Sequence, residues 1–219
     1  MITNKKIATV ILSSLMLFTC TVPYFANAEE NVNVDSANID PYVNNLSQNV
    51  NVDGKNYNLN FVYDENNNDN ITYIEDTKSE KMDVLIQDKD NGVFYLNGEK
   101  VAEIKTDFET PKALLGSSSY WKYINNSSTY ISWKKGIAAV VLAGIIAGAM
   151  GGGATAAAIL GSCGSNVMSL LAGGFIGGRL YWTKWYHVNV FNYHYKIDWA
   201  IKDPKGKRYG TYYVQYTME

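Results

Sequence analysis

Oxygen-bearing side chains between residues 64 and 75 follow the spacing of a calcium-binding loop. Positions 1, 3, 5, 8 and 12 of an EF-hand loop are matched by Asp64, Asn66, Asn68, Ile71 and Glu75. The sixth position holds Asp69, whereas the sharp turn of that loop requires glycine. The flanking residues alternate between apolar and polar, which indicates strands and not the helices of an EF-hand. We therefore interpret the segment as an Asn- and Asp-rich hairpin loop, with calcium binding as the minor alternative.

Residues with other catalytic or metal-binding chemistry are sparse. The two histidines, His187 and His194, are seven positions apart, a spacing that puts them on opposite faces of one predicted strand. A shared metal site is therefore not expected. The chain has no nucleophile elbow, no phosphate-binding glycine loop and no paired-cysteine metal motif. The sequence predicts a protein that is not an enzyme, with no catalytic residue, no metal and no cofactor.

The first residues have the features of a secretory signal peptide. Lys5 and Lys6 precede an apolar run over residues 7–18, and an Ala-x-Ala cleavage site ends at Ala28. We expect cleavage after Ala28 and secretion of the remaining chain. A lipoprotein anchored through Cys20 is the alternative, but the residues before this cysteine fit that signal poorly.

Charge is unevenly distributed along the secreted chain. Removal of the signal peptide leaves 17 basic and 21 acidic residues, and a net charge of −4 argues against nucleic-acid binding. Most acidic residues lie within 29–110, while residues 111–219 are net basic and more apolar. This asymmetry predicts two modules with different roles. Cys163 is the one cysteine left after cleavage, so no intramolecular disulfide is expected.

The acidic module divides into a leader and a β-rich domain. Residues 29–53 are rich in Asn, Val and Asp and are predicted to be weakly ordered. Residues 54–110 contain short runs of alternating apolar and polar residues, which predict a small antiparallel β-meander. Asn97 and Gly98 separate two of these runs and predict a type I′ hairpin turn.

Residues 111–135 are predicted to form a linker followed by an interfacial segment. Pro111 ends the preceding strand pattern, and the glycine- and serine-rich residues 116–119 suit a linker and a site of proteolysis. The aromatic residues that follow end in the lysine pair Lys134 and Lys135. Aromatic residues next to lysines are typical of a membrane–water interface.

Residues 136–180 are the most informative part of the chain, because they hold no charged residue up to Gly178. A helix needs about 20 apolar residues to cross about 30 Å of hydrocarbon, and residues 136–160 reach this length. A turn over residues 161–166 precedes a second, shorter apolar run. The pattern predicts a helical hairpin that inserts into a membrane. A hairpin buried inside a soluble protein is the alternative, since Ala and Gly make the net hydrophobicity modest.

Glycines in this segment recur at intervals of four. Small residues with this spacing form a flat helix face that allows close helix–helix packing in lipid. The candidate membrane-inserting and oligomerisation residues are Gly144, Gly148, Gly152, Gly173, Gly177, Gly174 and Gly178.

Residues 181–219 are rich in aromatic side chains and are predicted to form a β-hairpin around a turn at 203–207. The candidate interfacial anchors are Trp121, Trp133, Lys134, Lys135, Arg179, Trp182, Lys184 and Trp185. The predicted fold class is therefore α+β. It comprises a small N-terminal antiparallel β-meander, an Ala/Gly-rich apolar helical hairpin and an aromatic-rich β-hairpin.

The order of these segments resembles that of secreted bacteriocin-like proteins of Gram-positive bacteria, of the high-molecular-weight geobacillin type. The shared layout is a signal peptide, a polar β-rich leader, a Tyr-Trp segment, an Ala/Gly-rich apolar hairpin and a basic aromatic tail. The tail ends here in Tyr-x-x-Tyr-Thr at residues 213–217, and the resemblance covers roughly residues 117–219. It implies killing of related bacteria at their membrane after proteolytic release of the C-terminal half, and it carries over no catalytic residue.

We therefore expect a secreted, pore-forming antibacterial protein that inserts its glycine-rich hairpin into target membranes. Its expected partners are bacterial membrane lipids, further copies of itself and a processing protease, but not nucleic acid. Two alternatives remain open. One is a cell-surface protein that is anchored by the hairpin and binds through its β-rich domain. The other is a soluble, non-enzymatic secreted protein with a buried hairpin.

Overall fold

The computed structural model describes residues 46–105, 120–151, 154–188 and 193–218. The predicted signal peptide and its cleavage site lie outside these ranges. The helices are α1 (Ala139–Met150), α2 (Ala156–Cys163) and α3 (Ser165–Gly174). The strands are β1 (Leu46–Val52), β2 (Lys55–Asp64), β3 (Asp69–Asp76), β4 (Lys81–Asp88), β5 (Val93–Leu96), β6 (Glu99–Lys105), β7 (Trp121–Trp133), β8 (Gly177–His187), β9 (Tyr193–Lys202) and β10 (Arg208–Met218).

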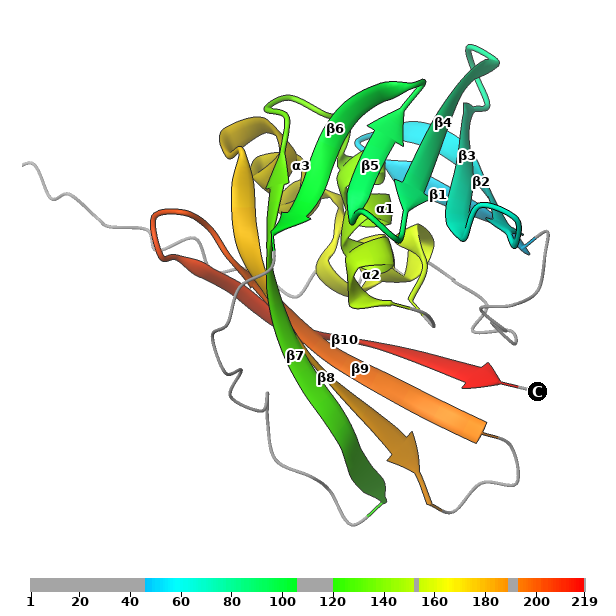
Figure 1. The fold of residues 1–219 in the computed structure, drawn as a ribbon. Coiled ribbons are helices and arrows are strands. Elements are labelled where there is room, and N and C mark those ends of the chain that lie inside the picture. The colour runs from blue at the N-terminus through cyan, green and yellow to red at the C-terminus, as the bar shows by residue number, and fades with distance from the viewer. Residues whose placement is uncertain (1–45, 106–119, 152–153, 189–192, 219) are drawn as a thin grey trace, which may run out of the picture.

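All ten strands belong to one antiparallel sheet, in which each strand pairs with its neighbours in the sequence. The sheet curves, and the helices lie on its inner side between β1–β6 and β7–β10 (Figure 1). Helix α1 contacts β3, β4 and β7, while α2 contacts both β1 and β10. The first and last strands of the sheet therefore approach the same helix.

Alternation of apolar and polar residues accounts for the strands, and turn residues account for their hairpins. Leu59 of β2 pairs with Ile74 of β3, and both side chains are buried. Between β5 and β6, Asn97 has a φ of 51° and Gly98 a φ of 83°. Both central residues of a type I′ turn need a positive φ, so the prediction of this turn is confirmed.

Glycine geometry divides the apolar segment into three helices. Helix α1 ends at Gly151, which has a φ of 65°, and α2 meets α3 at Gly164, which has a φ of 78°. Thr155 caps α2, because its hydroxyl accepts a hydrogen bond from the backbone N–H of Ala158 at 3.2 Å. No helix has a charged residue in its first or last turn to stabilise its ends. Packing in the core must therefore supply most of the stability of these helices.

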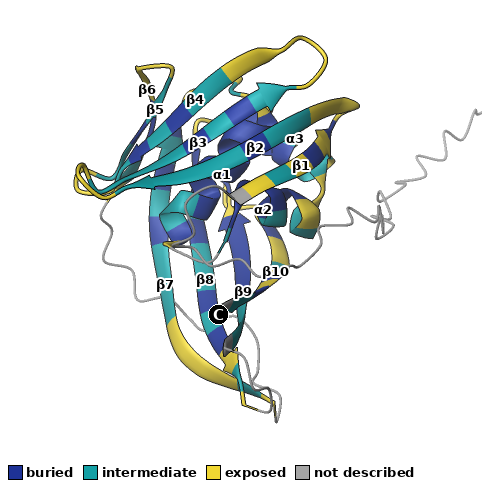
Figure 2. Cartoon of the chain, turned by 90° about the vertical axis from the view of Figure 1, so that its right-hand side faces the viewer, coloured by how far each residue is buried: buried dark blue, intermediate teal, exposed yellow. Residues whose placement is uncertain are grey.

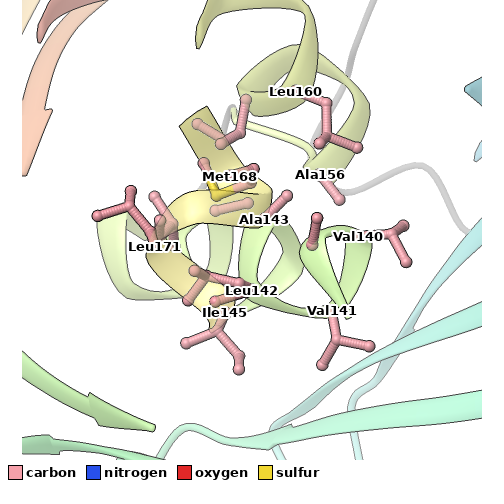
Figure 3. Packing of buried hydrophobic residues seen from close by; sticks show 14 of the residues in the cluster. Val140, Val141, Leu142, Ala143, Ile145, Ala156, Leu160, Met168 and Leu171 are labelled. Carbon is pink, nitrogen blue, oxygen red and sulfur yellow. The ribbon is translucent and has the colours of Figure 1, made fainter. Parts of the chain in front are cut away.

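The core lies between the helices and the inner face of the sheet. Strand centres are buried and several hairpin ends are exposed (Figure 2). Every residue of α1 from Ala139 to Ala147 is buried. Leu142 and Ile145 of this helix lie near Met168 and Leu171 of α3 (Figure 3). A helix that is apolar on all sides is stable in a protein core or in a membrane, and in this fold it occupies the core.

The predicted fold class was wrong. The strands expected within residues 54–110 are present as β2–β6, but they continue into one sheet of ten strands instead of forming a separate small meander. Strand β7 replaces the expected interfacial segment, and β8 replaces the expected end of the helical hairpin. The hairpin itself is replaced by three short helices. Its first expected helix is interrupted after Met150, where the chain is rich in glycine.

The two ends of the chain also differ from expectation. Residues 46–52, which belong to the segment expected to be weakly ordered, form β1 and pair along their whole length with β2. His187 and His194 were expected on one strand, but β8 ends at His187 and β9 begins at Tyr193, so the two histidines belong to different strands. The turn expected at 203–207 does join β9 to β10.

Candidate functional site

The three helices form one continuous insertion between two strands that pair with each other. The backbone N–H of Trp133 donates to the carbonyl of Ile176 at 3.0 Å, and that of Gly136 donates to the carbonyl of Ala172 at 2.9 Å. The chain therefore enters and leaves the helical insertion, residues 134–176, at one place, which we call the neck. The ladder between β7 and β8 reaches Ser132 and Gly177, so the insertion interrupts the chain between these strands but not their pairing.

Two of the predicted glycines bring α1 into close contact with the sheet. A Cβ atom at Gly144 would lie 2.7 Å from Cδ2 of Leu85, and one at Gly148 would lie 2.5 Å from Oε1 of Gln87 and 3.0 Å from Cε1 of Phe94. The side-chain amide of Gln87 donates to the carbonyl of Gly148 at 3.2 Å. In the folded protein this glycine face approaches β4 and β5 most closely, and Gly144 also lies near Ala156 of α2. No local sequence pattern marks these strand residues as partners of the helix.

The remaining predicted glycines do not form a matching helix face. Gly152 lies outside the described residues. Gly173 and Gly174 end α3, and a Cβ atom on either would meet open space. Gly177 and Gly178 belong to β8, where added Cβ atoms would press on the neighbouring strands β7 and β9. The structure therefore does not bring the predicted oligomerisation residues together.

Helix α2 is held to the sheet by an aromatic pair from β9 and β10. Trp199 is fully buried, its indole N–H donates to Oγ of Ser162 at 3.1 Å, and its ring centroid lies 4.9 Å from that of Tyr212. Burial raises the pKa of Tyr212 to about 12. Burial likewise raises the pKa of the Cys163 thiol, at the end of α2, to about 12. Both groups are therefore neutral at physiological pH.

The rate at which Cys163 is alkylated measures whether α2 stays packed against the sheet. A thiol with a pKa of about 12 is ionised to about one part in 10⁴ at pH 8, against about one part in 10 for a thiol of the ordinary pKa of 9.0. We expect iodoacetamide to modify the native protein about 1,000-fold more slowly than the urea-unfolded chain. Mass spectrometry of timed samples gives both rates. Equal rates would contradict the burial of this thiol.

The predicted tryptophan anchors do not share one surface. Trp133 and Trp185 are buried, and Trp182 packs against the core. Trp121 lies at the opposite end of β7 from the neck. The four tryptophans therefore lie in different parts of the fold and do not form one aromatic surface that could contact a membrane.

The predicted basic anchors are also dispersed. Lys134 pairs with Glu99, while Lys135 is exposed beside the neck. The ammonium of Lys184 lies 5.3 Å and 5.5 Å from the ring centroids of two tyrosines in β9 and β10, and burial lowers the pKa of this lysine. Arg179 is part of β8. Lys135 and Arg179 thus remain close to the neck, whereas Lys184 belongs to an aromatic cluster within the sheet.

His187 and His194, which were expected on opposite faces of one strand, lie on neighbouring strands and meet. Their ring centroids are 6.2 Å apart, and the ring of Trp121 is 4.9 Å from the first and 5.5 Å from the second. The ammonium of Lys196 lies 5.4 Å from the ring centroid of Trp121 and 3.2 Å from Oδ2 of the buried Asp198. Sequence spacing missed this cluster because the two histidines lie on the antiparallel strands β8 and β9.

The Asn- and Asp-rich segment is a hairpin turn, as predicted. Asp64 accepts hydrogen bonds from the backbone N–H of Asn66 at 3.0 Å and from the side-chain amide of Asn67 at 2.7 Å. The hydrogen bond from the Asn67 side chain is the main cause that lowers the pKa of Asp64. Among the residues that the structure describes, no group of three or more His, Cys, Asp or Glu side chains is arranged to hold a metal ion.

Comparison with known families, curated proteins and solved structures finds no match to this chain. Within the described ranges, no single helix is long and apolar enough to cross a membrane. Helices α2 and α3 together reach that length and composition, but they meet at a bend of 103°. The candidate functional site is therefore defined by the helical insertion and its neck.

Proposed function

We propose that this chain is a secreted, non-enzymatic antibacterial protein that stores its apolar helical insertion inside the sheet and transfers it to a target membrane. The observation that supports this most directly is the combination of residues 136–176 of the insertion, which carry no charge, with a single neck. The insertion is apolar enough to enter lipid, and its departure leaves the ladder between β7 and β8 intact. The proposed partner is the lipid of a bacterial membrane.

The physical cost of release depends on the surroundings. Exposing the buried surface of α1 to water costs about 25 cal/mol per Å² of apolar area, so the insertion stays in the sheet in solution. Hydrocarbon removes this cost, because it offers the same apolar environment as the core. We therefore propose that contact with a bilayer, and not spontaneous opening, drives the transfer.

Transfer also requires the helices to rearrange. Helix α1 has 12 residues and is about 18 Å long, shorter than the roughly 30 Å of a hydrocarbon core. We propose that α2 and α3 straighten at Gly164 once they leave the sheet. Gly144 and Gly148 would then be free of β4 and β5, and their face could pack against another helix in lipid.

A reversible tether between α1 and β4 tests the proposal. A Cβ atom at residue 148 would lie 3.0 Å from Cδ of Gln87, so cysteines at these two positions face each other. A disulfide needs Cβ atoms about 3.5–4.5 Å apart, and thiol titration of the oxidised protein first establishes that the bond has formed. We expect the Gln87→Cys/Gly148→Cys variant to release no dye from phosphatidylglycerol-containing vesicles when oxidised. The same protein should release dye when reduced, because α1 can then leave the sheet.

The matched control is Gln87→Cys alone, which cannot form the tether and should release dye under both conditions. Both variants carry Cys163→Ser, so that no other thiol takes part. Equal dye release from the oxidised and reduced double variant would show that α1 does not need to leave the sheet. If no form releases dye, including protein cleaved between residues 110 and 120, the alternative of a secreted protein with buried helices and no lipid affinity is favoured.

A further inference from the structure

The turn between β9 and β10 presents only positive charge at its surface. Its one acidic residue, Asp203, is buried, and Oδ1 accepts the backbone N–H groups of Lys205 and Lys207 at 2.9 Å each. The hydroxyl of Tyr209 donates to Oδ2 of Asp203 at 3.3 Å. Asp203 therefore shapes the turn from inside and does not neutralise its outer surface. The cations left exposed are Lys202, Lys205, Lys207 and Arg208.

Positive charges also lie directly opposite one another across three strands. Arg179 of β8 pairs in register with Lys202 of β9, and Lys202 pairs with Arg208 of β10. Like charges in this arrangement destabilise a sheet. In the part of the chain that the structure describes, neither Lys202 nor Arg208 forms an ion pair. An anionic partner would remove the repulsion between Lys202 and Arg208, so these two residues favour contact with negative charge.

Exposed apolar side chains lie at α3 and its junction with β8. The rings of Phe175, just after α3, and Tyr209, just after the turn, are 6.5 Å apart. Ile176, which follows Phe175 and forms part of the neck, is 62% exposed, and Leu170 of α3 is 49% exposed. Figure 1 shows the β9–β10 turn and the α3–β8 junction on the same side of the molecule.

We propose that this basic end, defined as Lys202, Lys205, Lys207, Arg208, Leu170 and Ile176, docks the folded protein on an anionic bilayer with the neck towards the lipid. The inference rests on the proposed function, since it adds the step before transfer. The four cations meet the lipid headgroups, and the two apolar side chains enter the interface. Docking in this orientation brings both ends of the helical insertion to the membrane before α1 leaves the sheet.

A bilayer fits these residues better than a soluble anionic polymer. A polymer would satisfy the cations but would leave Ile176 and Leu170 in water. A bilayer surface offers negative headgroups directly above hydrocarbon, so it matches both kinds of side chain at once. Binding should accordingly weaken with added salt, because charges near the surface are screened.

Vesicle co-sedimentation tests the docking step separately from transfer. The protein is the oxidised Gln87→Cys/Gly148→Cys form, in which α1 cannot leave, and the vesicles contain phosphatidylcholine with or without phosphatidylglycerol. Each basic residue near an anionic surface changes the partition coefficient about fivefold. We expect the added Lys205→Glu/Lys207→Glu substitutions to lower binding to anionic vesicles by at least about 100-fold.

Two control variants, one for the charged residues and one for the apolar residues, separate the basic end from general surface effects. Lys55→Glu/Lys78→Glu changes the net charge equally at exposed positions on other hairpins, and binding should be almost unchanged. Ile176→Ser should weaken binding several-fold, whereas Met82→Ser, at a residue that is 53% exposed on β4, should not. Equal losses in the two charge variants, or equal binding to vesicles without phosphatidylglycerol, would overturn the docking proposal. Docking without dye release after reduction would support the docking site and count against the transfer.

Discussion

Replacing Trp199 by alanine is expected to lower the free energy of unfolding by about 3–5 kcal/mol, the usual cost of removing a large buried aromatic side chain. The side chain is fully buried, and its indole N–H donates to Ser162 of α2. Its loss leaves a cavity between the sheet and α2 and deprives Tyr212 of its ring contact. Because α2 is then less firmly held, dye release should also begin at a lower lipid concentration.

Urea denaturation followed by circular dichroism measures this change, and two variants control it. Trp199→Phe keeps most of the packing and removes the hydrogen bond, so we expect a loss of about 1–2 kcal/mol. Tyr213→Ala removes an aromatic side chain that is 60% exposed on β10, and it should change stability by less than about 0.5 kcal/mol. A Trp199→Ala variant no less stable than Tyr213→Ala would show that β9 does not anchor α2.

Local patterns predicted the strands of the N-terminal half because those strands pair with their nearest neighbours. Leu59 and Ile74 belong to adjacent runs of alternating residues, and a short hairpin turn is enough to bring them together. The turn at Asn97 and Gly98 could be predicted for the same reason, since its backbone conformation depends on the two residue types themselves.

The role of the apolar segment could not be predicted because a membrane and a protein core select the same residues. Both exclude water, so a buried helix such as α1 and a membrane helix are apolar on every side. The feature that places α1 in a protein core here is the pairing of Ser132 with Gly177, which joins β7 to β8 across the whole insertion. No local signal marks these two residues as partners, and without that pairing β7 resembled an interfacial segment.

The basic end shows a second limit of sequence analysis. The turn at 203–207 was predicted, but its electrostatic role depends on where Asp203 points. In sequence the acidic residue partly offsets its basic neighbours. In the fold the carboxylate of Asp203 is buried and accepts hydrogen bonds from the backbone N–H groups of Lys205 and Lys207 and from the hydroxyl of Tyr209. Counting charges along the chain therefore does not reveal that the exposed charges of this turn are all positive.

The role of the glycine spacing can be decided by comparing Gly148→Leu with Gly173→Leu. In the folded protein, leucine at 148 would overlap the side chains of Gln87 and Phe94, and overpacking of this kind costs about 1–3 kcal/mol. The helix propensity gained by replacing glycine, about 1 kcal/mol at most, offsets part of this loss. Leucine at 173 meets open space, so we expect the stability of that variant to be unchanged or slightly higher.

Thermal unfolding and dye release, measured on both variants, distinguish packing in the fold from packing in lipid. If the glycines serve the sheet alone, Gly148→Leu should lower the melting temperature and release dye more readily, because α1 is held less tightly. If they also form helix contacts in the membrane, dye release should fall in both variants even though only one is destabilised. A melting temperature for Gly148→Leu above that of the unsubstituted protein would contradict the close approach of α1 to β4 and β5, which holds the insertion against the sheet.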